Sequence, residues 1–172
     1  MLIRSLAAAA LVASTLLFGA PPHAALAQTA GTAQPGDPRA LFSEDTSPRG
    51  FAETIVALKT AFEAAGWSVL STHDMAATLA EKGHKIMPVV IIEPCSGKYS
   101  VPLLQNDATR YVASLIPCRV AVYETAAGKV VVSRMNTVAM AGMMEPSVAD
   151  IMRKAGGEVD DIIAKALKGL GK

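Results

Sequence analysis

The chain has little of the chemistry on which catalytic and metal sites usually depend. It contains two cysteines and three histidines in 172 residues, and the spacing of His73 and His84 matches no metal-binding motif. No Ser-His-Asp arrangement, phosphate-cradling glycine loop or pair of acid-base carboxylates can be assembled from its motifs. The sequence therefore predicts no catalytic residue, and it favours a binding or accessory protein over an enzyme.

Long apolar runs are also missing, with one exception at the start of the chain. Arg4 precedes an Ala- and Leu-rich stretch over residues 5–20, and small residues occupy the −3 and −1 positions of a cleavage site after Ala27. The stretch is too short for a comfortable membrane span, and two prolines end it. Residues 1–27 therefore predict a cleavable signal peptide, a periplasmic or secreted location, and no stable membrane span after removal of the signal.

The rest of the chain has the composition of one domain. Residues 28–39 are rich in Gly, Pro, Thr and Ala and show no apolar periodicity, which predicts a flexible linker. Residues 40–172 are numerous enough to form a single domain with a sizeable core.

An excess of charge of either sign is absent. The formal net charge is +1, and loss of residues 1–27 removes Arg4 but no acidic residue, which leaves 15 basic and 15 acidic groups. Nucleic-acid binding and polybasic membrane association both depend on a net basic face. We therefore expect neither nucleic acid nor an anionic membrane surface as a partner, and a small ligand or a metal ion remains.

Apolar periodicity predicts that helices and strands alternate along the chain. The apolar residues of "FAETIVALKTAFEAAGW" recur at i, i+4, i+7 and i+11, which indicates a helix. A β-rich run ends at Pro94, and "CRVAVYET" and "VVVSRM" flank a Gly-containing turn as a β-hairpin. A long amphipathic helix follows Ser147. The order β-α-β-α-β-α-β-β-α predicts an α+β fold with a mainly antiparallel sheet.

Two segments resemble a known family. "FAETIVALKTAFEAAGWSV" resembles the opening of the family called domain of unknown function 302, and "LIPCRVAVYETAAGKVVVS" resembles its later segment, over about residues 40–135 together. The resemblance implies a TATA-binding-protein-like domain with helices on one face of the sheet, often a homodimer, and it implies no reaction. The long C-terminal helix lies beyond the minimal pattern. The cysteine pair resembles a subset of secreted members.

Both cysteines directly follow a proline, in "EPC" at Cys95 and "IPC" at Cys118. If the strands next to them are antiparallel neighbours, the two cysteines lie at the same end of the sheet. The hairpin returns to that end at Met135. Three further methionines follow: Met140, Met143 and Met144. We therefore expect up to six sulfur-bearing side chains to gather at one end of the sheet.

Several functions fit these sulfur atoms. A Cys95–Cys118 disulfide would close a loop of about 22 residues and stabilise an exported structural protein by about 3 kcal/mol. Cysteine thiolates and methionine thioethers are also the ligands that select Cu(I), so the six residues are candidate ligands of a copper site. A thiol-dependent redox protein is a third interpretation, and two unrelated free thiols are a fourth.

Overall fold

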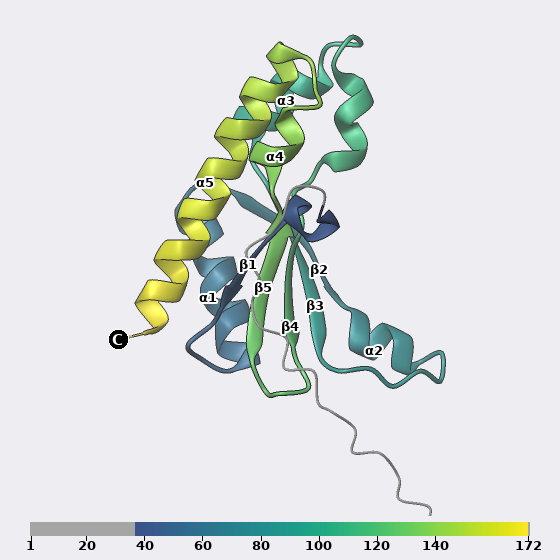
Figure 1. The fold of residues 1–172 in the computed structure, drawn as a ribbon, viewed down its shortest axis with the longest axis vertical. Coiled ribbons are helices and arrows are strands. Elements are labelled where there is room, and N and C mark those ends of the chain that lie inside the picture. Colours follow the sequence, from purple (N-terminus) through teal and green to yellow (C-terminus); the bar gives the residue numbers. More distant parts are fainter. Residues whose placement is uncertain (1–36, 172) are drawn as a thin grey trace, which may run out of the picture. The chain divides into compact units, whose positions relative to one another are not determined.

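The computed structural model describes residues 37–171. The predicted signal peptide lies outside this range, as does the predicted linker apart from its last three residues. The elements follow in the order η1 (Pro38–Leu41), β1 (Phe42–Thr46), α1 (Phe51–Ala64), β2 (Ser68–Asp74), α2 (Met75–Ala80), β3 (Val89–Cys95), α3 (Gly97–Leu104), η2 (Arg110–Leu115), β4 (Val120–Glu124), β5 (Val130–Met135), α4 (Thr137–Ala141) and α5 (Pro146–Leu170) (Figure 1). The predicted α+β class is confirmed. The short helix α4 and the two 3-10 helices are additions to the predicted order.

The five strands form one antiparallel sheet in the order β1-β5-β4-β3-β2. Ile92 of β3 faces Val120 of β4, and Val120 faces Arg134 of β5. The end of β3, the start of β4 and the end of β5 therefore meet at one end of the sheet. We call this end, which lies towards α3 and α4 in Figure 1, the helical end.

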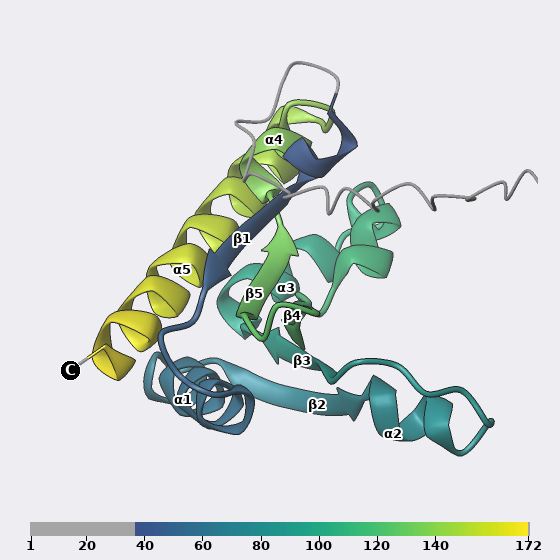
Figure 2. The same ribbon diagram turned by 60° about the horizontal axis from the view of Figure 1, so that its bottom comes forward.

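One face of the sheet carries the main core. Buried and less buried residues alternate along β3, which is what a strand with one covered face requires. Helices α1 and α5 cover that face and lie side by side (Figure 2). We call the buried residues that these elements share the large core: Leu58, Phe62, Trp67, Val90, Ile92, Val120, Val122, Val130, Val132, Ala155, Val159, Ile162 and Ile163.

Helix α1 has the local signals that its sequence predicts. The Glu53 carboxylate accepts a hydrogen bond of 3.3 Å from the backbone N–H of Gly50, where the helix starts. Gly66 follows the helix with φ of 79°, a conformation that glycine adopts without a Cβ penalty. Between these ends, Leu58 and Phe62 face the sheet and are fully buried. The predicted helix is therefore confirmed.

A second, smaller cluster lies at the helical end. Its buried members come from α3, η2 and α5, and we call them the small core: Leu103, Val112, Val148 and Met152. Among the described helices, none is both long and apolar enough to cross a membrane.

Among the contacts that fix α5 on the rest of the domain, two involve β5 and α4. Arg134 of β5, whose side chain is 11% exposed, donates to Asp160 of α5 at 2.7 Å and also pairs with Asp45 of β1. At the other contact, α4 packs so tightly on α5 that a Cβ added to Gly156 would lie 1.6 Å from Oγ1 of Thr137. Gly157 has open space at the same position. Glycine is thus required by packing at only the first of these two neighbouring sites.

Candidate functional site

A cavity at the helical end contains both cysteines in its wall. It encloses about 390 Å³ with its mouth included, and we call it the cysteine cavity. Cys95 reaches it from the end of β3, Cys118 from the segment before β4, and Met152 from α5. The remaining wall is mostly apolar or aromatic and includes Trp67, Tyr99, Leu103, Leu115 and Ile116. Three sulfur-bearing side chains from three parts of the chain therefore line one small apolar space.

The predicted Cys95–Cys118 disulfide is wrong, because both residues are free thiols in the structure. The strand register gives a physical reason. The β3–β4 pairing ends at Ile92 opposite Val120, and Cys118 lies before β4 begins, so no strand pairing holds the two cysteines opposite each other.

Burial sets the protonation of Cys118. Desolvation is the main cause that raises the pKa of its thiol to about 11, and the charge of a Cys95 thiolate adds to the effect. Arg119 is next in the chain, but its guanidinium lies 3.4 Å from the Glu93 carboxylate. Cys118 is therefore a neutral thiol near pH 7, and it is not an activated nucleophile.

The structure divides the predicted methionines between several places. Met135 lines a neighbouring cavity of about 360 Å³, together with Cys118 and Met152. Met144 packs against the small core, Met140 is partly buried on α4, and Met143 is 73% exposed. None of these last three lines either cavity.

Met152 is the sulfur residue that sequence reasoning missed. It is 5% exposed and lines both cavities. In the sequence it lies on the apolar stripe of the last helix, where a methionine is indistinguishable from core filler. Only the packing of α5 against the sheet brings it to the cysteines.

A carboxylate holds the aromatic part of the wall. Glu158 of α5 accepts hydrogen bonds from the Trp67 indole at 2.9 Å and from the Lys98 ammonium at 2.8 Å, and it also accepts one from the Tyr99 hydroxyl. These donors, Lys98 first, lower the pKa of Glu158 to about 2. The same ion pair raises the pKa of Lys98 above its ordinary value. Glu158 is therefore ionised at neutral pH, and it ties α5 to α3 and to the residue before β2.

Neither His73 nor His84 lines this cavity. His73 is on β2 with its Nε2 3.4 Å from Glu93, on a strand whose pairing partner is β3. Within residues 37–171 there is no group of three or more His, Cys, Asp or Glu side chains that could hold a metal ion.

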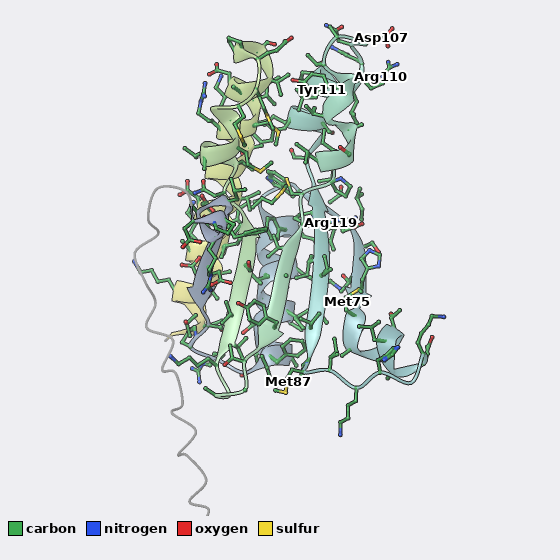
Figure 3. The ribbon with its side chains drawn as sticks, turned by 45° about the vertical axis from the view of Figure 1, so that its right-hand side comes forward. Met75, Met87, Asp107, Arg110, Tyr111 and Arg119 are labelled. Atoms are coloured by element: carbon green, nitrogen blue, oxygen red, sulfur yellow. The ribbon has the colours of Figure 1, made fainter. Side chains whose placement is uncertain are left out.

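Figure 3 shows Arg119 at the helical end of the sheet and Met87 at the opposite end. Met87 is thus an exposed methionine remote from the cysteines, useful as a control.

Comparisons with known proteins agree with the fold. The crystal structure of an uncharacterized conserved protein DUF302 from Bacillus stearothermophilus is similar, with a TM-score of 0.63 and 24% identity, over 74% of this chain and 96% of that one. A comparison with curated proteins gave no match. The sequence profile described as "Domain of unknown function DUF302" matches residues 44–167, which includes most of the long C-terminal helix that the resemblance alone left outside the pattern. The chain therefore belongs to the DUF302 family.

Proposed function

We propose that this domain binds one Cu(I) ion in the cysteine cavity, with Cys95, Cys118 and Met152 as its ligands. The observation that carries the proposal is the presence of these three sulfur-bearing side chains in one small, otherwise apolar wall. Thiolates and thioethers are soft ligands, and they favour Cu(I) over ions that take oxygen ligands. No reaction is part of the proposal, so the domain acts as a binding or accessory protein.

The ligand chemistry favours Cu(I) over other common metals. Structural zinc sites use four Cys or His ligands, and calcium and magnesium sites use several carboxylates. The described residues hold no cluster of three such side chains, whereas methionine and cysteine together suffice for Cu(I). The ligand set differs from the predicted one, because Met152 takes the place that the sequence suggested for Met140, Met143 and Met144. Met135 lines the neighbouring cavity and is not one of the three proposed ligands.

The size of the cavity favours an ion over an organic ligand. Pockets for organic ligands measure about 300–1,000 Å³. The cysteine cavity reaches 390 Å³ only with its open mouth included, so the enclosed part is smaller. The redox alternative gains no support from Cys118, because burial raises the pKa of its thiol to about 11, so that it becomes a thiolate only when a bound metal ion displaces its proton.

The test is an anaerobic Cu(I) titration of the reduced protein against a competing Cu(I) chelator. Trp67 is the only tryptophan in the chain and lines the cavity, so its fluorescence reports binding at this place. We expect one ion per chain and quenching that saturates at that ratio. Cys95→Ser and Cys118→Ser each abolish competitive binding, and Met152→Leu weakens it about tenfold.

Two matched controls make the result specific. Met143→Leu changes an exposed methionine near the helical end, and Met87→Leu changes one at the far end of the sheet, so both keep wild-type affinity. The proposal fails if wild-type protein does not compete with the chelator. It also fails if binding survives both cysteine substitutions, because the copper would then be held elsewhere.

A further inference from the structure

The hydrogen bonds of Glu158 hold two side chains that line the cysteine cavity, which an ion pair that only stabilised the fold would not require. Both oxygens of the carboxylate are used: Oε1 by the Trp67 indole, and Oε2 by Lys98 and Tyr99. Trp67 and Tyr99 both line the cysteine cavity, and their ring centroids are 5.8 Å apart. One carboxylate on α5 therefore fixes two neighbouring rings in the wall of the cavity.

The same contact fixes the helix that carries one of these rings. Ser96, Tyr99, Ser100 and Leu103 come from α3 or its N-cap, and all four line the cavity. The Lys98 ammonium lies 4.8 Å from the centroid of the Tyr99 ring and pairs with the same Glu158 oxygen. The first turn of α3 is thus held towards α5 through Glu158, and its residues form one part of the cavity wall.

We propose that Glu158 is a specificity-determining residue that holds Trp67 and Tyr99 as a size-selective wall. This wall admits small soft ions to Cys95 and Cys118, and it excludes bulky molecules that would bind to or react with their thiols. This inference builds on the proposed copper site, because it assigns the selectivity of the same cavity. It concerns access to the thiols, however, and access can be measured without copper.

Glutamine is the substitution that the hydrogen bonds single out. Glu158→Gln keeps the shape of the side chain but leaves one acceptor oxygen in place of two. The amide can then satisfy Trp67 or the Lys98–Tyr99 pair, and its NH₂ group faces the other donors. We expect one of the two rings to lose its hydrogen bond to residue 158, while the packing of α5 is unchanged.

The experiment compares two thiol reagents on copper-free reduced protein. A methanethiosulfonate with a methyl group is the small reagent, and a maleimide linked to a fluorescein is the bulky one. Cys95→Ser and Cys118→Ser assign the two rates. In Glu158→Gln we expect the bulky reagent to react at least fivefold faster and the small one less than twofold faster. The ratio of the two rates cancels any change in thiol ionisation.

Asp150→Asn is the matched control. Asp150 is also on α5 and accepts from Arg153 at 3.0 Å, but it does not line the cavity. Its substitution leaves the ratio of rates unchanged. Tyr99→Phe keeps the ring and removes one donor to Glu158, so it raises the ratio too, and it decides the question if Glu158→Gln does not fold.

Two results overturn the inference. An equal acceleration of both reagents shows general loosening, and an unchanged ratio in both variants shows that Glu158 does not hold the wall. Absence of copper binding in wild-type protein removes the proposed function but leaves the ratio as measured. The two proposals therefore fail separately.

Discussion

The large core and the small core of this domain differ in composition and in packing. The large core joins the valines and Ile92 on one continuous face of the sheet to Trp67 and to apolar side chains of α1 and α5. The small core has four buried members, one of them a methionine, and it borders the cysteine cavity. Apolar burial contributes about 25 cal/mol per Å², so stability is concentrated in the first region. The proposed copper site is next to the second, where packing leaves space.

The largest expected effect tests the first half of this comparison. Phe62→Ala removes a fully buried ring that packs against Trp67 at a centroid distance of 6.0 Å. We expect the free energy of unfolding to fall by about 4 kcal/mol, as is typical of a buried Phe→Ala change. Urea unfolding followed by circular dichroism measures it. A loss below about 1 kcal/mol would mean that the sheet face is not the main source of stability.

The next effect tests the small core. Leu103→Ala removes a side chain that is 2% exposed and that belongs both to the small core and to the cavity wall. Because the atoms around the deleted side chain can relax into the neighbouring cavity, we expect the free energy of unfolding to fall by a smaller amount, about 3 kcal/mol. Faster labelling of Cys95 and Cys118 accompanies it. A loss equal to that of Phe62→Ala would erase the distinction between the two cores.

Replacing either of two adjacent glycines on α5 by alanine should change the stability of the protein in opposite directions. Gly156→Ala sets a Cβ 2.9 Å from Cβ of Thr137, which rotation of the threonine cannot relieve, so we expect a loss of about 2 kcal/mol. Gly157→Ala meets nothing within 4 Å and gains helix propensity of about 1 kcal/mol. Thermal unfolding of both variants checks the pair. Two changes of the same sign would show that α4 does not pack closely on α5.

The smallest effect is a pH dependence. The folded-state pKa of Glu158, about 2, lies below its ordinary value of 4.5, so its contribution is present above pH 4.5 and is lost as the pH falls towards 2. Because the side chain is 29% exposed, solvent screening reduces this contribution to about 1 kcal/mol. The difference in unfolding free energy between wild type and Glu158→Gln should therefore shrink between pH 4.5 and pH 2. If the difference in unfolding free energy stays constant over this pH range, the ion pair is not its cause.

Local patterns were sufficient to predict the elements that depend on local physics. The apolar spacing of α1, the proline at the end of β3 and the turn of the hairpin lead to the observed order and to an antiparallel sheet. They also lead to the placement of Cys95, Cys118 and Met135 at one end of it.

The parts that could not be predicted depend on how α5 packs. Met152 and Glu158 lie more than thirty positions from Cys118 along the chain, and their periodicity marks only a helix with a buried stripe. The disulfide was wrong for a finer reason, since a sequence can show where two strands end but not how the side chains beyond their last paired residues are oriented. The signal peptide and the homodimer stay predictions.

The buried guanidinium of Arg134 has a consequence for the order of events during synthesis. Its two partners, Asp45 and Asp160, lie on opposite sides of it in the sequence, and the second is made last. Until residue 160 has left the ribosome, α5 cannot cover the sheet face that carries Arg134, and the guanidinium keeps water in place of Asp160. We therefore expect the domain to mature in one step after release of the chain, and not gradually during translation.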